Sequence, residues 1–223
     1  MKLRDSVLLI LVIIIADQAL KIWIKTSFTF GHVTNMLGFD WAQLYFIENE
    51  GMAWGWKWGG EWGKMLLTLF RLAAVLFGTW YLGRIVKQRY TKGFIICASL
   101  IYAGALGNLI DSMFYGMIFE SSENGNVAGM FTGNGYAGFL HGHVVDMLYF
   151  PMVDTTWPSW VPWLGGSRLE FFSPIFNIAD ASISIGVITL LIFQKKLVRK
   201  EEPDIQQNTI TTNTQLSDKA QVM

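Results

Sequence analysis

The sequence contains little cysteine and little charge. Cys97 is the single cysteine among 223 residues, which excludes an intramolecular disulfide framework and a metal site built from several cysteines. Charged residues make up 15% of the chain, against roughly 25% in an average soluble domain. The 17 basic and 17 acidic residues balance, so the basic excess of nucleic-acid-binding proteins is missing. A soluble enzyme is therefore disfavoured, and no nucleic-acid partner is expected.

Hydrophobic residues, by contrast, reach 52% of the chain, and they gather in four runs of 18 to 21 residues. A membrane-spanning helix needs about 20 residues at a rise of 1.5 Å per residue. The first run lacks the cleavage site of a signal peptide, so we expect it to be retained as a helix. The sequence predicts an all-α polytopic membrane protein, a single domain over residues 1–200. Its four transmembrane helices would cover residues 7–24, 65–83, 94–114 and 175–194.

Basic residues are divided unevenly between the connecting segments. Eleven lie at the two ends and between the second and third runs, against four in the two longer loops. Because lysine and arginine are enriched on the cytoplasmic side of membrane proteins, both termini are predicted to be cytoplasmic. The loops 25–64 and 115–174 then face outward. Residues 201–223 are polar and poor in aromatic residues, which predicts a disordered cytoplasmic tail.

The two outer loops carry aromatic segments. Residues 40–58 alternate roughly between aromatic and other side chains, which predicts a small β element. Residues 155–166 combine three tryptophans with two prolines. Tryptophan prefers the headgroup layer of a membrane, so we expect a helical or loop segment on the outer membrane surface, with anchoring favoured over substrate contact. Residues 121–138 are rich in glycine and asparagine, which indicates a mobile insert.

Polar residues interrupt the apolar runs at seven positions. An ionisable side chain within a membrane is costly, so each requires a partner or a function. With the topology above, all seven lie in the outer halves of their helices. This predicts one polar site beneath the outer membrane surface. The residues are Asp17, Lys21, Arg71, Asn108, Asp111, Asn177 and Asp180.

Helical spacing groups several of these residues. Asp17 and Lys21 are four residues apart, in the favourable order for an ion pair. One face of the third run carries Gly104, Asn108, Asp111 and Tyr115. A small residue such as Gly104 permits close helix approach. For Asp17, Lys21 and Asn108, a role in holding helices together is the favoured interpretation.

Two aspartates are candidates for chemistry. Asp180 carries a charge that helix packing alone does not require, since a neutral residue would hold helices together without the cost of burying a charge. Asp146 lies between apolar residues in the second outer loop. It would supply a second carboxylate at the same depth.

Five short motifs, taken in their order along the chain, resemble the lipoprotein signal peptidase (signal peptidase II) family. No single motif is specific for this family, but the five motifs in this order on a four-span topology are specific together. The motifs are Asp17-Gln18 with Lys21, Asn49-Glu50-Gly51-Met52-Ala53-Trp54, the segment from Gly104 to Asp111, Val144-Val145-Asp146, and Phe176-Asn177-Ile178-Ala179-Asp180.

The resemblance implies an aspartic endopeptidase of the bacterial inner membrane, with its active site near the outer face. Such an enzyme removes the signal peptide from diacylglyceryl-modified prolipoproteins by cleaving before the lipidated cysteine. It uses no metal and no organic cofactor. The implied partners are these prolipoproteins, membrane lipids and the cyclic peptide inhibitor globomycin.

The resemblance also implies roles for individual residues. Asp146 and Asp180 would form the catalytic dyad. The family pattern continues with arginine where this chain has Ser112, and we hypothesise that Arg71 supplies the missing positive charge. The supporting polar and small residues would be Asp17, Lys21, Asn49, Gly51, Gly104, Asn108, Asp111, Asn177 and Ala179.

Two other functions are compatible with the pattern. His141, His143 and Asp146 offer three ligands for a metal-dependent intramembrane hydrolase, although the spacing is not that of an HExxH motif. A small ion or proton transporter would use the buried charges as a path. The apolar inner halves of the helices and the absence of a visible internal repeat argue against transport.

Overall fold

The computed structural model describes residues 1–49, 60–123, 125–151, 153–171 and 174–200. Within these residues, four helical segments are long and apolar enough to cross a membrane: Leu3–Ser27, Trp62–Lys87, Lys92–Ile118 and Ile178–Leu197. The expectation of four membrane-spanning helices is thus confirmed, and the protein is a multi-pass membrane protein. Residues 50–59 and the predicted tail 201–223 lie outside the described part of the chain.

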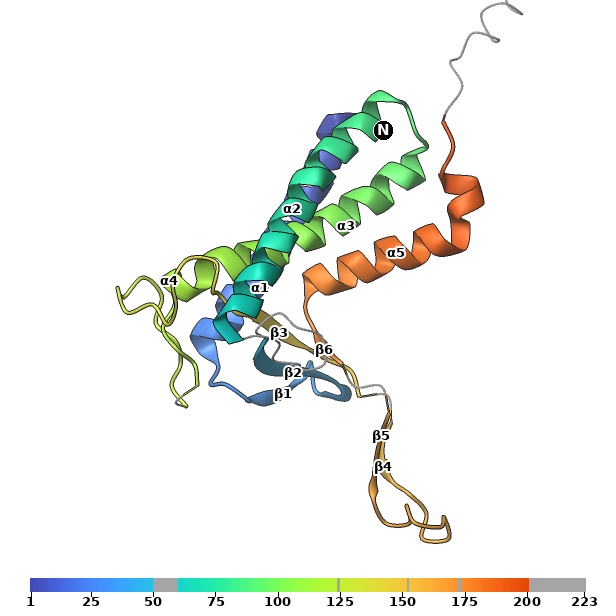
Figure 1. The fold of residues 1–223 in the computed structure, drawn as a ribbon. Coiled ribbons are helices and arrows are strands. Elements are labelled where there is room, and N and C mark those ends of the chain that lie inside the picture. Colours follow the sequence, from blue (N-terminus) through green and yellow to red (C-terminus); the bar gives the residue numbers. More distant parts are fainter. Residues whose placement is uncertain (50–59, 124, 152, 172–173, 201–223) are drawn as a thin grey trace, which may run out of the picture.

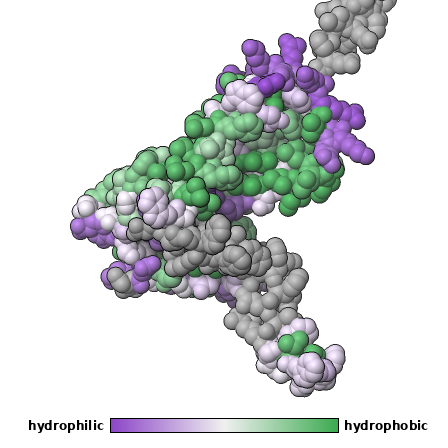
Figure 2. Space-filling view, viewed as in Figure 1, coloured by the Kyte–Doolittle hydropathy of each residue, from purple (hydrophilic) through white to green (hydrophobic). Residues whose placement is uncertain are grey.

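The helices expose their apolar side chains to the outside. Leu8, Val12, Phe70, Leu76 and Leu191 are all more than half exposed, which is the arrangement expected of helices that face lipid. Figure 2 shows this as an apolar band over the helices, with hydrophilic residues gathered at the end where α2 (Gly60–Lys87) joins α3 (Lys92–Ile110).

The central helix of the bundle is α3. It packs against α1 (Leu3–Ser27), α2 and α5 (Ile178–Leu197), and its contacts with α5 are the most extensive. Two glycines permit this closeness. A Cβ atom at Gly104 would lie 2.2 Å from the Ala179 carbonyl oxygen, and one at Gly186 would lie 2.8 Å from the Cys97 carbonyl oxygen. Each helix can approach the other only because these side chains are missing.

A π-helical turn, η2 (Asp111–Tyr115), follows α3 directly and leads into the short α4 (Gly116–Ile118). The helical run therefore continues past residue 114, where the sequence predicted its end. π turns are rare and are frequently found at functional sites. Here the turn begins with Asp111, one of the predicted site residues.

The segments between the membrane helices form a four-stranded antiparallel sheet at one end of the bundle (Figure 1). Its strand order is β1 (Val33–Met36), β2 (Phe39–Asn49), β3 (Val144–Tyr149) and β6 (Ile175–Phe176). The all-α description therefore needs correction. The small β element predicted in residues 40–58 is part of this sheet, but its pairing with β3 and β6 was not predicted.

Strand β6 also shifts the last membrane helix. Residues 175 and 176 pair with Tyr149 and Leu148 of β3, so α5 begins at Ile178 instead of residue 175. The sheet packs on the helices through an apolar cluster that includes Ile24 of α1, Phe46 of β2 and Met147 of β3. This cluster brings the strand that carries Asp146 against the helices.

A separate hairpin consists of β4 (Val153–Thr156) and β5 (Arg168–Phe171). It contains the tryptophan-rich segment for which a helical or loop conformation was expected. In Figure 1 the hairpin leaves the four-stranded sheet and extends away from the helices. It pairs with none of the strands of the larger sheet.

Candidate active site

Asp146 and Asp180 are joined through one asparagine. Asp146 lies on β3 and is 3% exposed, whereas Asp180 lies in the first turn of α5 and is partly exposed. Asn177 caps the N-terminus of α5: its Oδ1 accepts the backbone N–H of Asp180 at 2.8 Å. Its Nδ2 donates to Asp146 Oδ1 at 2.7 Å. The capping residue therefore positions one carboxylate while it binds the other.

A second asparagine links the dyad to the helices. Asn108 of α3 donates its Nδ2 to Asp180 Oδ1 at 2.7 Å. Its Oδ1 accepts Lys21 Nζ at 3.0 Å and Asn177 Nδ2 at 3.2 Å. Asn108 was interpreted as a residue that holds helices together, but its amide also binds Asp180.

Lys21 is fully buried between two carboxylates. Its Nζ lies 2.8 Å from Asp17 Oδ2 and 2.8 Å from Asp111 Oδ2. Asp17 Oδ1 in turn accepts the backbone N–H of Ala179 at 2.9 Å. This ion-pair network therefore ties α1 to α3 and to the first turn of α5. A buried charge of either sign would be costly without such partners.

Arg71 reaches the same region from α2. Its Nη1 donates to Ser112 Oγ at 2.7 Å, and Ser112 Oγ donates to the Asn108 carbonyl at 2.8 Å. The guanidinium also interacts electrostatically with Asp180, Asp111 and Asp146. A positive charge thus lies close enough to both dyad carboxylates to affect them.

The end of β2 supplies Asn49, which is opposite Val144 in the sheet. Its side chain hydrogen-bonds to Asp146. Burial and the nearby Asp180 carboxylate raise the pKa of Asp146 to about 7, although Lys21 and the hydrogen bonds from Asn177 and Asn49 act in the opposite direction. Gly51, also a predicted site residue, lies outside the described residues.

Glycines of α3 let these groups meet. A Cβ at Gly104 would clash with the Ala179 backbone, as described above, and one at Gly107 would lie 2.9 Å from Asp17 Oδ2 and 3.3 Å from the Ala179 Cβ. Close packing of α3 against α5 is therefore a condition for the contact between Asn108 and Asp180.

Two site residues were not predicted. Gln18 donates its Nε2 to Asp111 Oδ1 at 2.7 Å, and its Oε1 accepts the Tyr115 hydroxyl at 3.1 Å. Gln18 lies next to Asp17 in the first motif, and Tyr115 is eleven residues after Gly104 on the same predicted helix face. The available signals were that Gln18 is a polar residue in an apolar run and that Tyr115 lies at the end of a polar helix face.

The loop histidines have other contacts. His141 is partly exposed and its Nδ1 lies 2.9 Å from the Phe139 carbonyl. His143 Nδ1 lies 3.3 Å from Glu48 Oε2. In the described part of the chain, no three His, Cys, Asp or Glu side chains gather as metal ligands would. This geometry lends no support to the ligand set proposed for a metal-dependent hydrolase.

A second buried polar cluster lies where α1 meets the sheet. Lys25 of α1 forms an ion pair with Glu48 of β2 and donates to Ser122 Oγ at 2.9 Å. Ser122 Oγ donates to Glu48 Oε1 at 2.8 Å. The Lys25 ammonium also lies 5.0 Å from the centre of the Tyr136 ring, a cation–π contact. We call this group the Lys25–Glu48 cluster.

The fold and these contacts define a class of protein: a four-span membrane protein with paired carboxylates held at the junction of its helices and a small sheet. Comparison with known proteins gives the family. Residues 9–195 match the family model described as signal peptidase (SPase) II, so the chain belongs to the signal peptidase II family.

Several relatives are similar over most of their length. A lipoprotein signal peptidase of Porphyromonas gingivalis is 45% identical over 194 residues, which cover 85% of this chain and 82% of the relative. One from Amoebophilus asiaticus is 31% identical over 209 residues, covering 92% and 84%. A solved structure, described as a bacterial membrane enzyme determined by the in meso method, superposes with a TM-score of 0.54 at 25% identity, covering 91% of this chain and 94% of the other.

Proposed function

We propose that this protein is an aspartic endopeptidase of the bacterial inner membrane that removes the signal peptide from diacylglyceryl-modified prolipoproteins. Cleavage falls before the lipidated cysteine. The observation that carries the aspartic mechanism is the joining of Asp146 and Asp180 through Asn177. Membership of the signal peptidase II family supports the prolipoprotein substrate.

Two neighbouring carboxylates share one proton, because both cannot easily ionise together. With its pKa raised to about 7, Asp146 holds this proton. Asp180, the more exposed of the two, accepts a proton from the attacking water while Asp146 donates its own to the scissile carbonyl oxygen. When the tetrahedral intermediate collapses, Asp180 protonates the leaving amine and Asp146 regains a proton from the intermediate. The products are a carboxylic acid and an amine.

Arg71 supports this chemistry as a source of positive charge near the dyad. Its contact with Ser112 and its interaction with Asp180 and Asp146 support the role. Arg71→Leu should lower the turnover number strongly, and the double variant Ser112→Arg/Arg71→Leu should restore part of it by placing the charge at the neighbouring position. A double variant that folds normally and is as inactive as Arg71→Leu would contradict this role.

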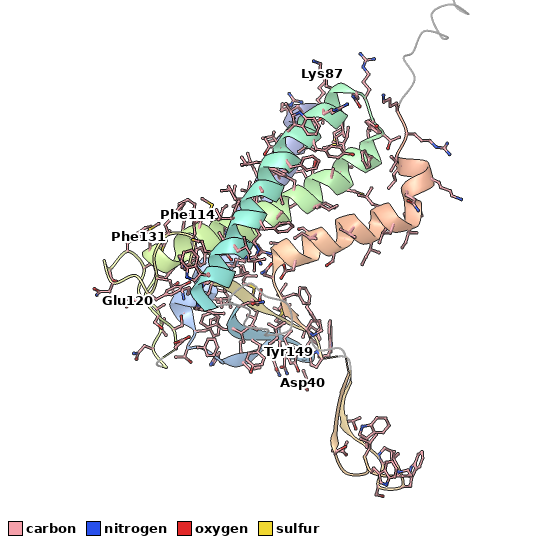
Figure 3. The ribbon with its side chains drawn as sticks, in the orientation of Figure 1. Asp40, Lys87, Phe114, Glu120, Phe131 and Tyr149 are labelled. Carbon is pink, nitrogen blue, oxygen red and sulfur yellow. The ribbon has the colours of Figure 1, made fainter. Side chains whose placement is uncertain are left out.

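The proposed orientation places both termini in the cytoplasm and the active site near the outer face. The basic residues support it. In Figure 3, Lys87 lies at the opposite end of the helices from Asp40 and Tyr149, which belong to the sheet. Because basic residues favour the cytoplasmic side, the sheet and the dyad face outward, where water for hydrolysis is available and a lipid-bearing substrate can arrive through the bilayer.

The decisive experiment uses purified protein and a prolipoprotein with and without its diacylglyceryl group. We expect cleavage of the modified form only, and inhibition by globomycin, which would occupy the same site. Asp146→Asn and Asp180→Asn should each abolish cleavage. Both variants should still fold, as shown by a cooperative thermal unfolding transition. Asp40→Asn, which alters an exposed acid on β2, is the matched control and should stay active. Near-normal turnover in either dyad variant would overturn the mechanism.

A further inference from the structure

The β4–β5 hairpin ends in a well-defined loop. Thr156 pairs with Arg168 at the end of the strands. Beyond this pair, the Trp157 N–H donates to the Ser167 carbonyl at 2.9 Å, and the Gly166 N–H donates to the Trp157 carbonyl at 2.9 Å. The Gly165 N–H donates to the Val161 carbonyl at 3.0 Å. Backbone hydrogen bonds thus hold residues 157–167 in one conformation, which we call the hairpin tip.

The hairpin tip displays large apolar side chains. Trp163 is fully exposed, at 103% of its reference area, and Trp160 is 80% exposed. Trp163 also has φ of 66°, in the left-handed region that bulky side chains rarely adopt. Such backbone outliers gather at functional positions. No residue between 155 and 166 carries a charge, so the exposed surface offers nothing to an ionic partner.

This hairpin forms a two-stranded sheet of its own. An isolated two-stranded hairpin is marginally stable in water, and an exposed apolar tip does not stabilise it there. A partner that covers the apolar tip would stabilise the hairpin. In Figure 3 the hairpin tip lies apart from the helices and the four-stranded sheet, so no other described part of the chain covers it.

The base of the hairpin lies where the chain enters the membrane. β3 ends at Tyr149, and the chain returns through β6 directly into the membrane helix α5. Phe150 at this base packs on Trp41 and Phe176, with ring centres 6.3 and 5.8 Å apart. A tryptophan such as Trp41 is typical of the headgroup layer, and the adjacent α5 is a membrane helix. A lipid surface is therefore already adjacent to the hairpin.

We propose that the hairpin tip is a lipid-surface anchor, which inserts Trp160 and Trp163 into the headgroup layer of the leaflet at the sheet's end of the helices. Tryptophan suits this layer because its large apolar ring carries one polar N–H group. The anchor would hold the sheet, and with it the strand that carries Asp146, at a fixed depth. It goes beyond the proposed peptidase activity and does not depend on it.

The test measures how deeply the tip lies in lipid. Trp163→Cys and Glu123→Cys are made in a Cys97→Ala background, labelled with a nitroxide and reconstituted into phosphatidylcholine vesicles. Oxygen concentrates in the bilayer, whereas a water-soluble nickel chelate is excluded from it. The ratio of oxygen to nickel collision rates should be several-fold higher at position 163 than at Glu123, an exposed acidic loop residue. Substitution of Trp163 removes a fully exposed side chain, so the variant should fold, and Trp160 together with the apolar nitroxide ring keeps the tip apolar.

Two results would overturn the anchor. Relaxation of the label at 163 by the nickel chelate as strongly as that of the label at 123 would place the tip in water. Alternatively, the label at 163 could be shielded from both reagents and show spin–spin broadening that disappears when unlabelled protein is added. That outcome would identify a second copy of the chain, and not lipid, as the partner of the tip.

Discussion

At the scale of single residues, Asn177 connects the start of a helix to the chemistry of the site. Its Oδ1 caps α5 through the Asp180 N–H, and its Nδ2 binds Asp146. Loss of a helix cap alone costs about 1 kcal/mol. Substitution here would also remove the hydrogen bond to the Asp146 carboxylate, so the loss of activity should exceed what the lost cap alone would cause.

The raised pKa of Asp146 predicts a pH-dependent stability. The carboxyl titrates near 3.9 in an unfolded chain, but at about 7 in the folded protein. Between these values the folded state holds a proton that the unfolded state has lost. The contribution of the Asp146 carboxyl to the free energy of unfolding is therefore fully present below about pH 4 and is lost as the pH rises to about 7.

Thermal unfolding across this pH range checks the prediction. The midpoint of the wild-type protein should decline with rising pH more steeply than that of Asp146→Asn, which has no proton to lose. Asp40→Asn should keep the wild-type slope because Asp40 is exposed. Equal slopes for wild type and Asp146→Asn would show that Asp146 does not titrate in this range.

At the scale of helices, the approach of α3 to α5 predicts opposite outcomes for two glycine substitutions. Gly104→Ala places a Cβ against the Ala179 backbone, so the helices must separate. The expected cost is about 1–3 kcal/mol, with loss of activity because Asn108 moves away from Asp180. Gly83→Ala on α2 meets no atom within 4 Å and should be neutral or stabilising by roughly 0.5–1 kcal/mol.

Thermal unfolding and cleavage assays on both glycine variants separate packing from a general effect of alanine in a helix. The packing argument requires that only Gly104→Ala loses activity. If Gly104→Ala were as stable and active as Gly83→Ala, α3 and α5 would have to be less closely packed than described.

At the scale of the whole molecule, the Lys25–Glu48 cluster joins the helices to the sheet. Both side chains are nearly inaccessible, at 0% and 5% exposure. Removing one member of a buried ion pair costs about 3–5 kcal/mol, because the other charge is left unpaired, whereas replacing both is often tolerated. Lys25→Met and Glu48→Gln should each lower the unfolding midpoint, and the double variant should recover much of the loss. Additive losses in this double-mutant cycle would mean that the pair is not coupled.

The membrane helices could be predicted from the sequence because hydropathy and length act locally. The gathering of Asp17, Asn108 and Asp180 followed from topology, since each lies in the same half of its helix. The sheet could not be predicted in the same way. Pairing of Ile47 with Asp146 joins strands far apart in the chain, and hydropathy does not encode which strand pairs with which. Gln18 was overlooked because its contact with Asp111 depends on how two helices face each other.

The π-helical turn between α3 and α4 has a consequence for the length of the chain. Such a turn accommodates one residue more than an α-helical turn. Removing one residue from this turn would give an unbroken α-helix in which the following residues keep roughly their direction, because four α-helical residues cover about the same rotation as five π-helical ones. The extra residue therefore widens the turn between Asp111 and Tyr115, which both bind Gln18, without turning the rest of the helix away from α1. Descendants of this sequence should therefore tolerate loss of the exposed Phe114 better than loss of a residue within α3, where a deletion rotates everything after it by roughly 100° about the helix axis.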